Sequence, residues 1–155
     1  MQAKLPRIKK VLTKLLLALP ALLPAMAWAL DYRSVATDKA VLYDAPSAQA
    51  KKLFIVSQYY PVEVVVNLGD WIKVRDNRGE LAWIEAKQLA AKHMVLVTAP
   101  QAEVRESADE GAPLVFRTEK DVSLELLEAS PSGWAKVRHR DGLTGYIQSS
   151  KVWGL

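Results

Sequence analysis

The sequence predicts an all-β protein made of two tandem small barrels that pack together. The main observation is an internal repeat: WIKVRDNRGELAWI at residues 71–84 returns as WAKVRHRDGLTGYI at residues 134–147, and repeats of this kind indicate duplicated modules. Around each Gly-containing turn, apolar residues alternate with polar ones, as in a two-stranded hairpin. No helical periodicity of useful length follows residue 30. Short strands with one apolar face bury that face by curling into a small barrel or an orthogonal sandwich.

The N-terminal segment has the pattern of a secretory signal peptide. Residues 1–14 contain five basic and no acidic residues, residues 15–23 form the apolar run LLLALPALL, and residues 27–29 read AWA, a small-x-small cleavage site. An uncleaved anchor is the alternative, but the run is shorter than the ~20 residues of a spanning helix and is broken by Pro20. We expect cleavage after Ala29, export to the periplasm, and no stable membrane insertion afterwards.

Removal of this leader changes the charge balance. The whole chain has 21 Lys and Arg against 17 Asp and Glu, and the leader holds five of the basic residues, which leaves 16 against 17. The remainder therefore lacks the basic excess that nucleic-acid binding needs, and no nucleic-acid partner is expected. There is no cysteine, so disulfides cannot support modules of about 60 residues, a size at which a single core is marginal. We expect the modules to stabilise each other, and we leave the oligomeric state open.

The first module is expected to span residues 30–91, with residues 31–37 as a short lead-in and the module itself beginning near Ser34 and Val35. Extended segments are predicted at 41–47, 53–56, 61–66, 71–75 and 81–84, separated by turns that include 67–70 and 76–79. Period-two alternation places Ile72 and Val74 on one face, and Trp71, Lys73 and Arg75 on the other.

The second module is expected to span residues 92–155 and to repeat this order. Strands are predicted at 103–105, 114–116, 122–127, 134–137 and 144–147. The connection at residues 88–92, QLAAK, is not enriched in Pro, Gly or Ser, so we expect docked modules without a flexible linker. The predicted core positions in the two modules are Ile72, Val74, Ile84, Val137 and Ile147.

Several segments together carry a family resemblance. VLYDAPS at 41–47, PVEVVV at 61–66, Trp-x-Lys-Val-Arg with its Gly-containing hairpin, and GYIQSS at 145–150 resemble bacterial SH3 domains, two in tandem behind a signal peptide. The arrangement is also similar to a secreted family of unknown function that contains only such a pair. The resemblance implies two SH3-like barrels, with Trp71 and Trp134 at the place of the groove tryptophan.

The chain departs from SH3 domains that bind proline-rich peptides. Ala45 stands in place of the second groove aromatic, Gln148 in place of a proline, and Lys151 in place of the final tyrosine. We also align Glu106 of the second copy with Tyr43 of the first. Since a proline-rich helix docks on a row of aromatic rings, no PxxP recognition is expected.

Catalytic and metal sites are not expected. The two histidines, His93 and His139, fall in different modules and are predicted to be surface residues, whereas a metal site needs three or four converging ligands. His139 and Asp141 lie at a hairpin tip, where a catalytic triad would not be buried. Pairs of glutamates in strand-rich sequence are expected to face solvent. We therefore predict a non-enzymatic protein without a cofactor.

The outer faces of the tryptophan strands are the predicted ligand-binding sites. An aromatic ring with cationic neighbours can stack on a sugar ring or a peptide while the cations meet carboxylates. The alternative is that both tryptophans cap the barrels or pack one module against the other, covered by lysine side chains. The predicted ligand-binding residues are Tyr43, Trp71, Lys73, Arg75, Trp83, Trp134, Lys136, Arg138 and Tyr146.

Two functions follow from this prediction. The first is an exported binding module of the bacterial cell envelope that recognises peptidoglycan peptide or glycan, or an envelope protein, through the tryptophan and basic faces. The second is a structural or adaptor subunit of a periplasmic complex that does not bind the wall, with an interface on a sheet face or an edge strand such as 53–56.

Overall fold

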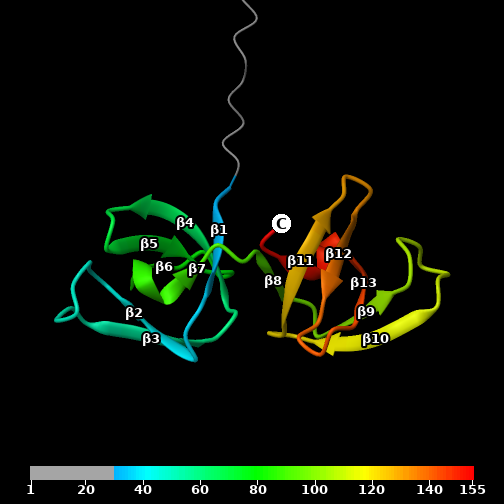
Figure 1. Cartoon of the computed structure of the whole chain (residues 1–155), viewed down its shortest axis with the longest axis horizontal. Coiled ribbons are helices and arrows are strands. Elements are labelled where there is room, and N and C mark those ends of the chain that lie inside the picture. The colour runs from blue at the N-terminus through cyan, green and yellow to red at the C-terminus, as the bar shows by residue number, and fades with distance from the viewer. Residues whose placement is uncertain (1–29) are drawn as a thin grey trace, which may run out of the picture.

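The computed structural model describes residues 30–155, in which the strands form two seven-stranded antiparallel sheets (Figure 1). The predicted signal peptide, residues 1–29, lies outside the described residues. Each sheet curls around its own hydrophobic core, which confirms the all-β prediction with two tandem barrels. No helix among the described residues has the length and apolar character needed to span a membrane.

The first sheet has the strand order β3-β2-β6-β5-β4-β1-β7. A short 3₁₀ helix, η1, precedes its last strand. The elements are β1 (Tyr32–Val35), β2 (Lys39–Tyr43), β3 (Lys52–Ser57), β4 (Pro61–Asn67), β5 (Trp71–Arg75), β6 (Leu81–Glu85), η1 (Ala86–Gln88) and β7 (Leu89–Ala90).

The second sheet has the order β10-β9-β13-β12-β11-β8-β14. It matches the first sheet strand for strand, so the internal repeat includes every element. The elements are β8 (Met94–Val97), β9 (Gln101–Arg105), β10 (Leu114–Glu119), β11 (Ser123–Ala129), β12 (Trp134–Arg138), β13 (Thr144–Gln148), η2 (Ser149–Lys151) and β14 (Val152–Trp153).

The repeated hairpins are β5–β6 and β12–β13. Lys73 lies opposite Trp83 and Lys136 lies opposite Tyr146. In the first turn, the buried Asp76 carboxylate accepts hydrogen bonds from the backbone N–H groups of Arg78 and Glu80, both at 2.9 Å. Each turn contains a glycine with positive φ, +84° at residue 79 and +96° at residue 142, a conformation that favours glycine.

The residues that period-two alternation assigned to the cores are buried, as predicted. Ile72, Val74, Ile84, Val137 and Ile147 are each at most 1% exposed. The first three belong to the core of the first domain and the last two to the core of the second.

Residues 31–37, which were expected to form a short lead-in, contain a strand that the sequence did not predict. β1 lies there between β4 and β7, with Ser34 opposite both Pro61 and Ala90. The segment YRSV has little apolar character, so its local pattern gives a weak strand signal. Its backbone is extended because strands far along the chain pair with it on both sides.

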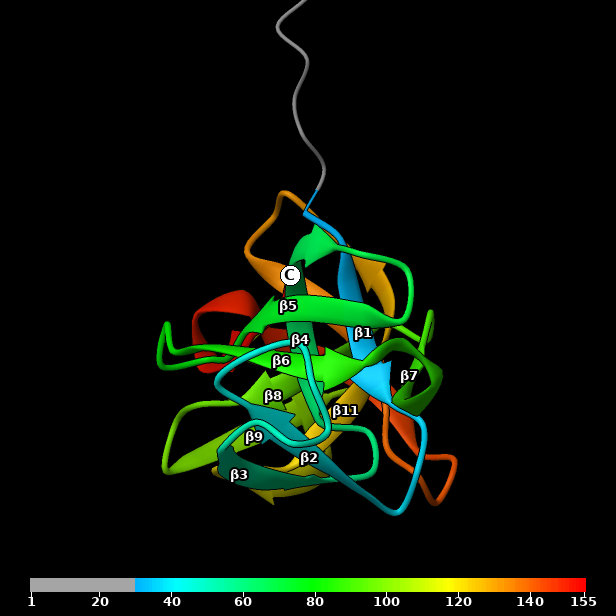
Figure 2. The same cartoon turned by 90° about the vertical axis from the view of Figure 1, so that its left-hand side faces the viewer.

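The two domains are in direct contact, as predicted for a closely joined pair. β8 contacts β1 and β4, and the Ser34 hydroxyl donates to the carbonyl of Lys92 at 2.8 Å. Tyr32 stacks on His93 and meets Trp153 edge-on, both at 5.4 Å between ring centroids. Figure 2 views the first domain with the second behind it.

His93 is therefore not the surface residue that the sequence predicted. It is half-buried, and its Nε2 donates to the carbonyl of Gly154 at 2.6 Å. The stacking partner comes from β1, which sequence reasoning did not identify as a strand. The contact thus depends on the docking of the domains.

Candidate functional site

The first aromatic face consists of Tyr43, Trp71, Lys73 and Trp83, all on the first sheet. Tyr43 of β2 lies opposite Trp83 of β6, which lies opposite Lys73 of β5. The Tyr43 and Trp71 rings meet edge to face at 5.4 Å and 84°, and Lys73 Nζ lies 5.7 Å from the centroid of Trp83. The structure thus brings four predicted residues together. The lysine of this face contacts Trp83, and not Trp71 as simple alternation would suggest.

Arg75 is separate from this cluster. Its guanidinium donates to both oxygens of the Glu63 carboxylate, at 3.0 and 3.1 Å. A cation held by a carboxylate in this way is less available to a ligand than Lys73, which forms no ion pair among residues 30–155.

Trp71 lines an open pocket of about 520 Å³ at one end of the first aromatic face. The opposite walls are the loop at residues 46–49 and the start of η1. Lys87 at this wall pairs with Glu85 at 2.6 Å, and the hydrogen bond that it donates to that carboxylate raises the pKa of Lys87. The pocket is large enough for part of a peptide or one sugar ring.

The second aromatic face consists of Arg105, Trp134, Lys136 and Tyr146. Lys136 Nζ lies 5.8 Å from the centroid of Tyr146, as Lys73 does from Trp83 in the first domain. Trp134 lines an open pocket of about 420 Å³ together with Arg105. Both domains therefore place the repeated tryptophan at the wall of a pocket.

Arg105, and not Glu106, is the counterpart of Tyr43. Arg105 lies opposite Tyr146, as Tyr43 lies opposite Trp83. The repeat spacing is 62 residues in this strand and 63 in the hairpin, so a uniform shift of 63 aligned the wrong residue. Sequence reasoning missed Arg105 at this position, and the spacing of 62 seen elsewhere in the repeat could have revealed it. Its guanidinium donates to the Glu103 carboxylate and, at 2.7 Å, to the carbonyl of Ala112. Arg105 is therefore held in place as Arg75 is, and is less available to a ligand than Lys136.

Arg138 does not join the second aromatic face. It is exposed and lies 3.7 Å from the carboxylate of Glu125. Glu125 also pairs with Lys92 at 3.3 Å, and Lys92 Nζ lies 5.3 Å from the ring centroid of Tyr59 in the first domain. These contacts connect the two domains side chain by side chain.

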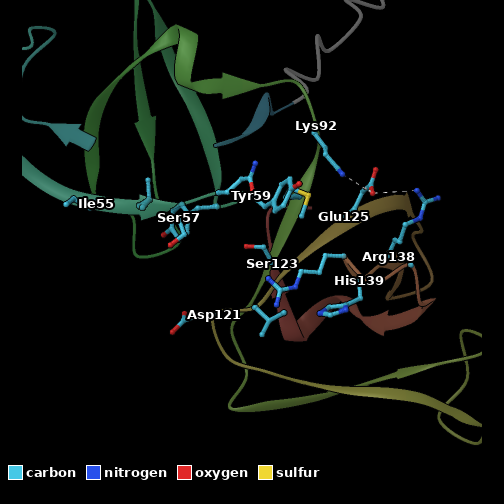
Figure 3. Close-up of a pocket in the computed structure, with 16 residues that line it drawn as sticks. Ile55, Ser57, Tyr59, Lys92, Asp121, Ser123, Glu125, Arg138 and His139 are labelled. Carbon is cyan, nitrogen blue, oxygen red and sulfur yellow. Dashed lines mark ion pairs between the residues drawn. The ribbon is translucent and has the colours of Figure 1, made fainter. Parts of the chain in front are cut away.

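An interdomain groove of about 750 Å³ surrounds these contacts (Figure 3). Residues 55–60 of the first domain form one wall. Parts of β11 and the β12–β13 turn form the other, and Lys92 lies between them. The groove depends on the relative placement of the domains, so local sequence patterns did not predict it.

His139 and Asp141, which were not expected to be catalytic, lie close together at the β12–β13 hairpin. His139 Nδ1 lies 2.9 Å from Asp141 Oδ1. The Leu143 backbone N–H and the His139 ring hold the pKa of Asp141 below its usual value. His139 is half-buried and its ring lies 5.6 Å from that of Phe116, so it is not a free surface histidine.

Within residues 30–155, no three His, Cys, Asp or Glu side chains converge as ligands for a metal ion.

Two segments of the chain, residues 36–90 and 98–154, match the bacterial SH3 domain family. The chain belongs to that family. The match confirms the predicted tandem pair of bacterial SH3 domains, and it begins just after β1 in the first domain and just after β8 in the second. No curated protein matches the sequence.

The solved structures to which this chain is similar include two that are named for NlpC or for the NlpC/P60 family. NlpC2 from Trichomonas vaginalis is 13% identical, with a TM-score of 0.38, and the match covers 81% of this chain and 48% of that chain. An NlpC/P60 family protein from Bacillus cereus ATCC 10987 is 18% identical, with a TM-score of 0.36, and the match covers 79% and 55%. The chain thus spans about half the length of these proteins.

Proposed function

We propose that this protein is an exported, non-enzymatic binding module of the bacterial cell envelope that holds peptidoglycan peptide or glycan on its two aromatic faces. One observation carries the proposal: Trp71 and Trp134, which occupy equivalent positions in the two domains, each line a pocket. Neither tryptophan belongs to a core cluster, and neither lies in the strands that join the domains. The periplasm is the proposed compartment.

The chemistry of each face suits a ligand with flat apolar surfaces and carboxylates. A half-exposed tryptophan ring can stack on a sugar ring or a peptide plane. Lys73 and Lys136 lie over aromatic rings and form no ion pairs within the described part of the chain, so their charges remain available to a ligand carboxylate.

Co-sedimentation of residues 30–155 with purified insoluble peptidoglycan tests this function. Trp71→Ala and Trp134→Ala are compared singly and together, and Phe54→Ala is the matched control because Phe54 is 38% exposed and lies outside both tryptophan pockets. Loss of a central aromatic contact commonly weakens binding by about tenfold or more, so the double variant should lose most retention. Circular dichroism checks that each variant is folded.

Two results would contradict wall binding: no retention of the unsubstituted protein, or full retention of the folded double variant. Retention that Phe54→Ala abolishes as strongly would assign the contact to β3 and not to the aromatic faces.

The second candidate function is an adaptor in a periplasmic complex, and the exposed edge of the first sheet favours it. β3 is the terminal strand of that sheet, and its Ile55 side chain is 69% exposed. An exposed edge strand is a template for pairing with another chain. Recovery of a protein partner from envelope extract, without retention on the wall, would favour the adaptor.

A further inference from the structure

The interdomain groove combines two features, an open sheet edge and a cluster of cations. Its volume of about 750 Å³ is in the range of protein ligand sites. The walls come from both domains, so a ligand in the groove would contact both at once.

The positive charges in the groove are only partly balanced by carboxylates. Lys92 and Arg138 share a single carboxylate, that of Glu125, at 3.3 and 3.7 Å. Arg140 also lines the groove and forms no ion pair within residues 30–155. Asp121, the other acid of the lining, is exposed and lies at the far edge of the groove in Figure 3, away from Glu125 and Arg138. The central part of the groove therefore favours an added carboxylate.

The opposite wall contains the edge strand β3. Residues 55–57 of β3 line the groove, and β3 pairs with β2 alone. In an antiparallel pair, every second residue directs its backbone N–H and C=O away from its partner strand. An extended peptide can pair with such groups by adding a strand to the sheet.

We infer that the interdomain groove binds an extended acidic segment of a partner protein, which adds as a strand along β3 and directs carboxylates toward Arg138 and Arg140. The inference rests on the adaptor function, to which it adds the chemistry of the partner and the place where it binds. It does not involve the two aromatic faces.

The direct test uses a fluorescent peptide with four Glu-Val repeats, blocked at both ends, and residues 30–155 of the protein. Fluorescence anisotropy should show saturable binding that weakens as salt is added, because the charges are partly exposed. The same peptide with Lys in place of Glu should bind at least tenfold more weakly. Failure of the Glu-Val peptide to bind, or equal binding of the Lys-Val peptide, would overturn the inference.

Charge-reversal variants locate the binding site. Arg140→Glu should weaken binding of the Glu-Val peptide by about tenfold or more, because like charges are then brought together. Arg117→Glu is the matched control, since Arg117 is exposed on β10 and lies outside the groove. Equal effects of the two variants would show non-specific charge attraction and would overturn the inference.

Peptide N-methylation tests strand addition without changing the protein. One peptide is methylated on the Glu nitrogens and the other on the Val nitrogens. In a strand, alternate N–H groups point to opposite sides, so only one of the two peptides should lose binding. Equal binding by both would overturn the strand-addition geometry.

Three further measurements separate this inference from the proposed functions. Trp71→Ala with Trp134→Ala should leave the affinity for the Glu-Val peptide unchanged. Soluble peptidoglycan fragments should not displace the peptide, and displacement would assign the groove to the wall. A partner protein recovered from envelope extract should bind the Arg140→Glu variant more weakly. If that variant binds the partner as well as the unsubstituted protein does, the adaptor function stands, but the groove is not the binding site and the inference is overturned.

Discussion

Gly145 is the position where one added methyl group should disturb the second domain most. A Cβ atom there would lie 2.6 Å from the carbonyl oxygen of Arg105 and 2.7 Å from Val104 Cγ1. Ordinary contacts begin at 3.4 Å, so the overlaps are 0.8 and 0.7 Å. One obstacle is backbone and the other is a fully buried side chain, and neither can move aside freely.

The expected cost of Gly145→Ala follows from this geometry. Overpacking of a well-packed interior costs about 1–3 kcal/mol, and the backbone obstacle places this substitution near 2–3 kcal/mol of that range. The first domain has Ala82 at the equivalent place, opposite Val74, as Gly145 lies opposite Val137. The two domains thus differ in how closely the paired strands approach each other here, β13 and β9 in the second domain and β6 and β2 in the first.

Urea unfolding at 25 °C, followed by tryptophan fluorescence, measures the loss, and amide hydrogen exchange locates it within residues 94–154. Gly111→Ala is the matched control, because the only neighbour within 4 Å of its added Cβ is the Asp109 side chain at 3.3 Å; it should change stability by less than about 0.5 kcal/mol. A loss below about 0.5 kcal/mol for Gly145→Ala would refute the reasoning, since the strands would then separate at little cost.

Three other predictions follow from burial and charge. Val137→Ala should cost about 1–3 kcal/mol in urea unfolding, because a fully buried side chain leaves a cavity; an unchanged midpoint would contradict this. Trp71→Ala should cost less than about 1.5 kcal/mol, the value of an aromatic pair, and a loss of 3 kcal/mol or more would make Trp71 a core residue. The Asp141 pKa is lowered by the Leu143 N–H and by His139, so this carboxylate stabilises the fold above its ordinary value of 3.8 and loses that effect as pH falls through the lowered value. Asp141→Asn should remove that part of the acid-induced loss, and identical acid profiles would contradict the assignment.

Much of the fold was predictable because its signals are local. In Trp71–Arg75 the alternation of apolar and polar residues assigned Ile72 and Val74 to the core, where they are buried. The turn glycines lie at positive φ, where glycine meets no steric penalty. β1 escaped prediction because its strand conformation depends on β4 and β7, and not on its own residues.

The candidate site was predictable only in part. Tyr43, Trp71, Lys73 and Trp83 converge because they share one face of neighbouring strands. Arg75 shares that alternation, yet Glu63 on the neighbouring strand holds it. Residue type and period identify which side chains point outward, but the partner that each one meets depends on strand pairing.

The sequence by itself therefore determined the repeated module, the strand positions in the hairpins and the residues of the core. Only the tertiary structure decided that His93 lies at the domain junction and that Lys92 and Arg138 share Glu125. The physical reason is the distance along the chain over which each kind of signal acts. Alternation and turn conformation depend on a few consecutive residues, whereas a groove between two domains exists only after both have folded and docked.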